Sequence, residues 1–162
     1  FRVYRSSDVI GVELAGAAKN VTAIAAGISD GLMLGSSARA ALITRGLAEL
    51  SRLVMALGGQ RDTVAGLAGL GDLALTCTGE LSRNRALGMR LARIANPAEA
   101  FKHHEGESIA EGVPNARAIV NLAKLSKVEM PIASAVYRTL YDGEAPQAMV
   151  EELLSRELKA EF

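Results

Sequence analysis

Aromatic residues make up only 4% of this 162-residue chain, and tryptophan is absent. Its single cysteine, Cys77, excludes an internal disulfide and is typical of a reducing compartment. Eighteen basic and eighteen acidic residues give a formal net charge of zero. This balance argues against binding to nucleic acid or to an anionic membrane. The apolar run at 21–28 is too short to span a bilayer, so we expect no membrane insertion.

Hydrophobic residues make up 49% of the chain and charged residues 22%, and there are 16 glycines. This composition predicts an all-α protein, because the apolar residues recur at helical spacing between capping and stop signals. Only residues 1–4 and 128–130 have the pattern of extended chain. The start and stop signals predict about seven or eight helices, at 9–34, 37–57, 62–67, 83–94, 97–104, 114–125, 131–141 and 146–154.

Lys19 is a cation in the middle of a predicted helix that is otherwise small and aliphatic. Burying an unpaired charge is costly, so this lysine needs a reason to be there. One interpretation is a side chain that reaches from a packed helix to water. The other is a lysine that lines a cleft and transfers protons, beside Asn20 and small neighbours such as Ala15 and Ala23.

Two further segments also allow a structural or a functional interpretation. Asp72 follows a glycine-rich turn, where it either caps a short helix or directs a carboxylate into a cleft. Ser82, Arg83 and Asn84 begin another predicted helix, whose free N–H groups favour anions. An arginine in the first turn opposes the helix dipole, so Arg83 is either solvated or binds a phosphate.

Other polar residues give weaker signals. His103 and His104 are neighbours without metal-ligand spacing, and we expect both at the surface and no metal site. Arg39 and Arg45 lie on a helix whose opposite face is apolar, and we expect both to be solvated. Cys77 has no evident activating base and is expected to be a small buried residue. The chain also lacks a strand followed by the G-x-G-x-x-G dinucleotide fingerprint.

Several motifs occur in a distinctive order. They are VIGVELAGAAKNV at 9–21, GLGDL at 69–73, TCT at 76–78, LSRNR at 81–85 and AEGV at 110–113. Together they resemble bacterial NAD(P)-dependent glycerol-3-phosphate dehydrogenase. The resemblance covers the chain as the helical substrate-binding domain of that enzyme, at 8–162, with a fold like the C-terminal domain of 6-phosphogluconate dehydrogenase-like enzymes. Residues 1–7 would end an N-terminal Rossmann domain that this sequence does not include.

The resemblance implies interconversion of dihydroxyacetone phosphate and sn-glycerol 3-phosphate with NADPH or NADH, for glycerophospholipid synthesis. It also implies a cytoplasmic homodimer, and a segment that is inactive without the Rossmann domain. Lys19 would be the catalytic proton donor and acceptor. Substrate contacts would come from Lys19, Asn20, Asp72, Ser82, Arg83 and Asn84. Cofactor contacts would come from Arg83, Ile109 and Glu111.

Two alternatives stay open at this stage. One is a related dehydrogenase that acts on another hydroxy acid through the same helical plan. The other is a non-catalytic all-α module for dimerisation or partner binding, which the alanine- and glycine-rich helices would suit. Convergence of Lys19, Asp72 and Arg83 in space would favour the enzyme, and their dispersal would favour the binding module.

Overall fold

The computed structural model describes residues 3–94 and 110–155. Within these ranges the protein is helical and contains no strand, and residues 128–130 lie between helices. Two π-helical turns adjoin α-helices: η1 (Leu67–Gly71) directly precedes one, and η3 (Arg138–Asp142) directly follows another. The α-helices are α1 (Val9–Gly31), α2 (Gly35–Ala56), α3 (Arg61–Ala65), α4 (Asp72–Thr78), α5 (Arg83–Leu91), α6 (Gly112–Leu125), α7 (Pro131–Tyr137) and α8 (Pro146–Ser155).

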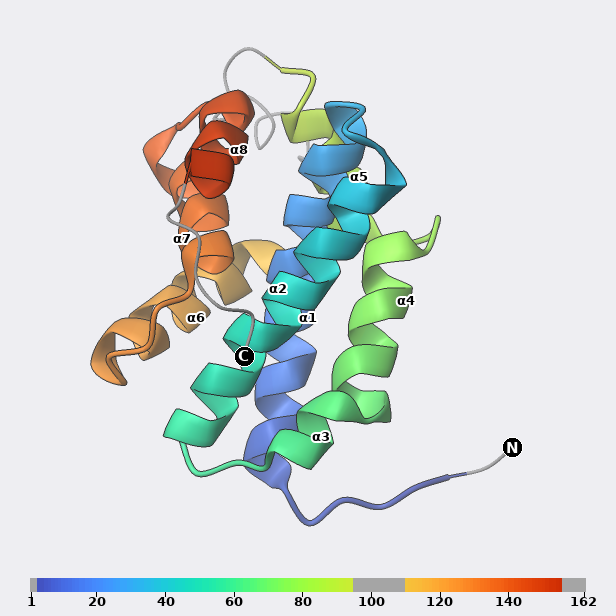
Figure 1. Cartoon of the computed structure of the whole chain (residues 1–162), viewed down its shortest axis with the longest axis vertical. Helices are drawn as coiled ribbons and strands as arrows, with labels where there is room; N and C mark the ends of the chain where they lie inside the picture. Colours follow the sequence, from blue (N-terminus) through green and yellow to red (C-terminus); the bar gives the residue numbers. More distant parts are fainter. Residues whose placement is uncertain (1–2, 95–109, 156–162) are drawn as a thin grey trace.

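Helix α1 runs through the centre of the molecule, with α4 on one side and α6 and α7 on the other (Figure 1). Asp8 caps the N-terminus of α1, because its carboxylate accepts a hydrogen bond of 2.9 Å from the Gly11 N–H. By length and composition α1 could cross a membrane, but 56% of that stretch is buried inside the protein. Such burial is expected of a core helix. The largest side chains around it with almost no exposed surface are Ile24, Ile28, Leu50, Leu53, Leu73, Leu91 and Ile119.

Glycines allow α1 and α5 to approach backbone to backbone. A Cβ atom on Gly27 would lie 2.0 Å from the carbonyl oxygen of Arg85. Reciprocally, a Cβ atom on Gly88 would lie 2.1 Å from the carbonyl oxygen of Ile24. The two glycines lower the helix propensity of α1 and α5, but they allow the two backbones to pack in close contact. This contact sets the position of α5 along α1.

Several predicted boundaries are confirmed and others need correction. Ser82 caps α5 through its side chain, and Gly143 ends the α7–η3 unit in the left-handed conformation, with φ of 75°. The glycine-rich stretch after 66 is not a loop, because η1 (Leu67–Gly71) leads directly into α4. Helix α6 begins at Gly112, two residues before the expected Pro114. The predicted helix at 97–104, with His103 and His104, lies outside the described residues.

A partly buried ionic cluster joins α1, α2 and α5. Asp30 accepts hydrogen bonds from Arg39 at 2.8 Å and from Arg85 at 2.7 Å. The expectation that Arg39 is solvated is therefore wrong, since only 25% of its side chain is exposed, whereas Arg45 is exposed as predicted. Cys77 is buried, as expected, and burial together with the Asp30 charge raises the pKa of its thiol to about 12.

Candidate active site

Lys19 lies midway along α1, and its ammonium forms an ion pair with the carboxylate of Asp72 at the start of α4. The lysine side chain is 22% exposed and the aspartate side chain 37% exposed. Lys19 is thus paired with Asp72 rather than extended into water. Asp72 does not cap its helix, since Gly71 holds that position. The arrangement is a partly exposed cation held in place by a neighbouring carboxylate.

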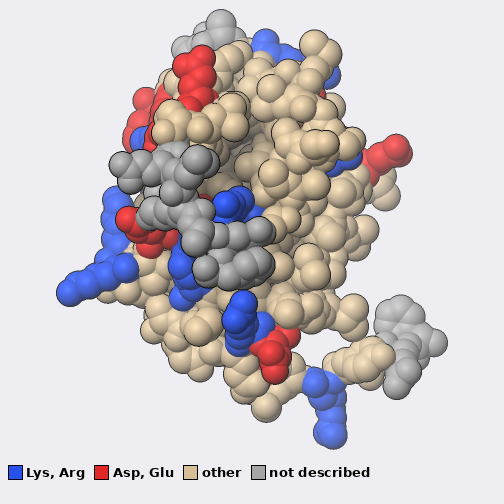
Figure 2. All heavy atoms as spheres, viewed as in Figure 1, with Lys and Arg blue, Asp and Glu red and all other residues tan. Residues whose placement is uncertain are grey.

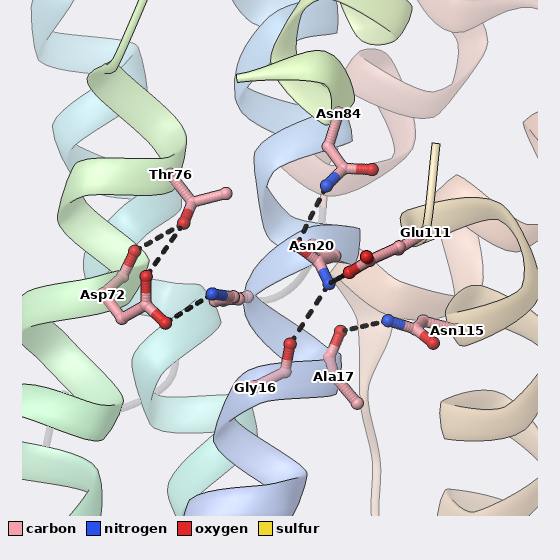
Figure 3. A network of polar contacts seen from close by, with 9 residues as sticks. Gly16, Ala17, Asn20, Asp72, Thr76, Asn84, Glu111 and Asn115 are labelled. Atoms are coloured by element: carbon pink, nitrogen blue, oxygen red, sulfur yellow. Dashed lines mark hydrogen bonds and ion pairs between the residues drawn. The ribbon is translucent and has the colours of Figure 1, made fainter. Parts of the chain in front are cut away.

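The turn before α4 delivers Asp72 to this position. Gly69 packs so tightly against α3 that a Cβ atom would lie 2.0 Å from the carbonyl oxygen of Val64. Because η1 continues into α4, the first carboxylate of that helix faces α1. One turn later, the Thr76 hydroxyl donates to the Asp72 carbonyl at 2.6 Å and lies 3.4 Å from Asp72 Oδ1 (Figure 3). Thr76 therefore supports the carboxylate that holds Lys19.

Asn20, on the opposite side of α1, belongs to a network of side-chain amides (Figure 3). Its Oδ1 accepts a hydrogen bond of 2.9 Å from Asn84 Nδ2, and Asn84 Oδ1 accepts one of 2.9 Å from the Gly112 N–H. Both asparagines are buried. Gly112 is needed here, because a Cβ atom would lie 2.8 Å from both the Asn20 carbonyl and Asn84 Oδ1. The network joins α1, α5 and the start of α6.

Arg83 and Glu111 lie at the exposed edge of this network. Arg83 Nη2 is 3.9 Å from Glu111 Oε1, and the two side chains are 59% and 68% exposed. The other carboxylate oxygen of Glu111 accepts a hydrogen bond of 3.3 Å from Asn20 Nδ2. The Ser82 hydroxyl accepts one of 3.3 Å from the Arg85 N–H, so in this structure it acts as the cap of α5.

The contacts form two groups on adjacent positions of α1. Lys19 pairs with Asp72, while Asn20 accepts a hydrogen bond from Asn84 and donates one to Glu111, whose other oxygen lies near Arg83. Ile109 lies outside the described residues. A separate surface hollow, lined by Met130, Ser134, Arg138 and Glu152 among others, contains none of the candidate site residues.

The molecule shows no surface of a single charge sign in the view of Figure 2. On the face shown in Figure 2, basic and acidic side chains are interspersed, which agrees with a formal net charge of zero. Within 3–94 and 110–155, no group of three or more His, Cys, Asp or Glu side chains could hold a metal ion. The site therefore presents discrete donors, namely an ammonium, a guanidinium and amides, rather than a broad charged surface.

Two supporting residues received no role from the sequence. Thr76 follows Asp72 by four residues, a spacing that places both on one face of a helix and could have indicated the contact. Asn115 Nδ2 donates to the Ala17 carbonyl at 3.2 Å and thereby attaches α6 to α1 (Figure 3). No local sequence pattern could indicate the Asn115–Ala17 contact, because the two residues are 98 positions apart in the sequence.

Comparison with known proteins gives consistent matches to this architecture. Residues 8–151 match the family model of the NAD-dependent glycerol-3-phosphate dehydrogenase C-terminus. The glycerol-3-phosphate dehydrogenase [NAD(P)+] of Citrifermentans bemidjiense is 56% identical over 161 residues, which cover 99% of this chain and 48% of that protein. A relative from Geobacter sulfurreducens is 54% identical with the same coverage.

Solved structures agree with these sequence matches. The crystal structure of glycerol-3-phosphate dehydrogenase from Coxiella burnetii superposes with a TM-score of 0.89 at 52% identity, over 96% of this chain and 47% of that one. The Saccharomyces cerevisiae enzyme gives a TM-score of 0.78 at 26% identity, over 92% of this chain and 43% of that one. The fold thus matches that of the C-terminal part of nicotinamide-dependent dehydrogenases.

The chain belongs to the family of NAD-dependent glycerol-3-phosphate dehydrogenase C-terminal domains. It spans about half the length of the relatives that it matches. This membership confirms the resemblance and the all-α fold, and it does not favour the non-catalytic module or another hydroxy-acid dehydrogenase.

Proposed function

We propose that this chain is the substrate-binding half of a glycerol-3-phosphate dehydrogenase, which interconverts dihydroxyacetone phosphate and sn-glycerol 3-phosphate with NADH or NADPH and serves glycerophospholipid synthesis. The observation that carries the proposal is the Lys19–Asp72 ion pair, next to which Asn20 is connected to Arg83 through Glu111. Relatives that are 54–56% identical carry the name of this enzyme. We place residues 8–162 in the substrate-binding domain, with 1–7 as the end of a cofactor-binding domain.

The proposed role of Lys19 follows from the charge that develops during the reaction. Reduction of a ketone leaves negative charge on the carbonyl oxygen, and a positioned ammonium both stabilises that charge and donates the proton. Asp72 accepts a hydrogen bond from the ammonium and so orients it. The exposed part of the lysine side chain leaves room for a substrate oxygen to bind beside the carboxylate. In the reverse direction, the neutral amine accepts the proton of the alcohol.

The phosphate of the substrate is proposed to bind near Arg83. A guanidinium can bind a phosphate through two parallel hydrogen bonds, and the Arg83 side chain is 59% exposed. Ser82, Asn20 and Asn84 complete the proposed substrate site. Binding energy gained at the phosphate, away from the reacting carbon, positions the carbonyl beside Lys19.

A nicotinamide cofactor fits the donors present at the edge of the site. Arg83 can contact a phosphate group and Glu111 a ribose hydroxyl, because both side chains are more than half exposed. Ile109 is the third proposed contact. When bound, the cofactor supplies or accepts the hydride, and the residues of this chain provide position, charge and a proton.

The cell compartment and assembly of the whole protein also belong to the proposal. We expect a cytoplasmic homodimer without membrane insertion, as the family resemblance implies. The burial of α1 inside the bundle and the balanced charge of the chain support a protein that neither inserts into membranes nor binds nucleic acid.

The test replaces the C-terminal half of the Citrifermentans bemidjiense relative with this chain, and follows reduction of dihydroxyacetone phosphate by nicotinamide absorbance. We expect Lys19→Ala to lower kcat by about 10²–10⁴-fold, the usual contribution of general acid–base catalysis. Lys124→Ala removes an exposed lysine from α6 and is the matched control, with turnover unchanged. A Lys19→Ala chimera that turns over like the control would refute the proposed role.

A further inference from the structure

Glu111 contacts two donors that the proposed function assigns to the substrate. One carboxylate oxygen accepts the hydrogen bond from Asn20 Nδ2, and the other is 3.9 Å from the Arg83 guanidinium. The carboxylate therefore bridges α1 and α5 across the edge of the site. A phosphate also has two or more oxygens with which to accept from the same two donors.

The contact between Asn20 and Glu111 matters because Asn20 has few hydrogen-bond donors to share. A side-chain amide has two N–H donors, and a carbonyl oxygen that only accepts. Asn20 Nδ2 donates to the Gly16 carbonyl at 3.1 Å and to Glu111 at 3.3 Å, while its oxygen accepts from Asn84. The Gly16 carbonyl is part of the α1 backbone and cannot move away. Asn20 can thus donate to a ligand only if Glu111 gives up its hydrogen bond.

Glu111 is also the partner that can move. Its side chain is 68% exposed, whereas Asn20 and Asn84 are buried. An exposed ion pair contributes little stability, so the Arg83–Glu111 contact can break without disturbing the fold. A phosphate dianion carries more charge than a carboxylate, and it competes well for the same guanidinium.

We propose that Glu111 is an internal competitor for the phosphate of the substrate: its carboxylate binds Asn20 and Arg83 in the empty site, and the substrate phosphate must displace it. This inference rests on the proposed function, because it takes Arg83 as the phosphate ligand. Since only molecules with Glu111 displaced can bind, the measured affinity is lowered by the fraction in which it is bound. Glu111 thereby adjusts affinity for the phosphorylated substrate.

The experiment titrates the 162-residue chain with sn-glycerol 3-phosphate and follows the side-chain amide signal of Asn20 by NMR. Glu111→Ala removes the competitor, and Glu80→Ala removes an equal charge from an exposed position two residues before Ser82. We expect Glu111→Ala to tighten binding about two- to five-fold, the range for loss of an exposed ion pair. Glu80→Ala should leave the Kd unchanged, and Arg83→Ala should weaken binding.

Each other result overturns the proposal in a recognisable way. Equal tightening in the Glu111 and Glu80 variants would show that net charge alone acts. No tightening in Glu111→Ala, while Arg83→Ala still weakens binding, would refute the competition and leave the proposed phosphate site intact. Absence of any Arg83-dependent binding would refute the phosphate site itself, and the competition with it.

A parallel titration with NAD⁺ separates the substrate phosphate from the phosphates of the cofactor. Tightening that is confined to sn-glycerol 3-phosphate supports the proposal. Tightening for NAD⁺ alone would place Glu111 in competition with the cofactor, and would overturn the assignment to the substrate.

Discussion

Replacing Gly27 with alanine tests whether backbone contact sets the position of α5 on α1. The added Cβ atom would lie 2.0 Å from the Arg85 carbonyl oxygen and 2.8 Å from its carbon, distances that real Cβ atoms essentially never show. The obstacle is backbone, so no side-chain rotation relieves it, and the helices must separate. Overpacking costs about 1–3 kcal/mol, and we expect the upper end of this range.

The same substitution also brings a gain, because alanine favours a helix over glycine by about 1 kcal/mol. The net expectation for Gly27→Ala is therefore a loss of about 2 kcal/mol in the free energy of unfolding. For a chain of this length, each kcal/mol shifts Tm by about 2–4 °C, so Tm should fall by about 4–8 °C.

Gly16→Ala is the matched control on the same helix. A Cβ atom there would meet nothing within 4 Å, so the propensity gain stands alone, and we expect a stabilisation of about 0.5–1 kcal/mol. Urea denaturation followed by circular dichroism measures both variants, with the m-value as a check that unfolding stays two-state. If Gly27→Ala is as stable as Gly16→Ala, the helices do not depend on this contact and the reasoning fails.

Two further predictions concern ionisable groups away from the site. Hydrogen bonds from Thr63, Gly11 and Gln60 lower the pKa of Asp8 below its ordinary 3.8, so its stabilising contribution is present above that pH and is lost as the pH falls through the lower, folded-state value. The difference in urea midpoint between wild type and Asp8→Asn should hold between about pH 7 and 5 and shrink below about pH 4; a constant difference would exclude the carboxylate charge as its source. Because its pKa is raised to about 12 and its thiol is buried, Cys77 should resist a thiol-specific disulfide reagent in the native protein and react after unfolding in urea. Rapid native-state labelling would show that the thiol is accessible.

Local signals predicted most of the helices, because caps and stop residues act within one helical turn. Asp8 and Ser82 accept the hydrogen bonds expected of N-caps, and Gly143 adopts the left-handed conformation that ends η3. The η1–α4 unit was missed, because its glycines are typical of loops. Those glycines serve tertiary contact instead, as the approach of Gly69 to Val64 shows.

The candidate site, too, could be predicted from the sequence only in part. The order of the motifs around Lys19, Asp72 and Arg83 indicated the family and the residues of interest. It did not indicate that Arg39 is paired with Asp30. It also left open whether Lys19 reaches water or lines a site, because both interpretations agree with an isolated cation on an apolar helix.

By itself, the sequence determined the all-α class, most helix ends and the family, since these depend on composition, spacing and neighbouring residues. The contact partners of the site residues, in contrast, follow from the packing of the helices. Lys19 meets Asp72 across 53 positions of sequence, and Asn20 meets Glu111 across 91. Contacts at such separations depend on how helices pack, here on glycines that bring α5 and α6 against α1. Packing therefore pairs the lysine of α1 with a carboxylate of α4.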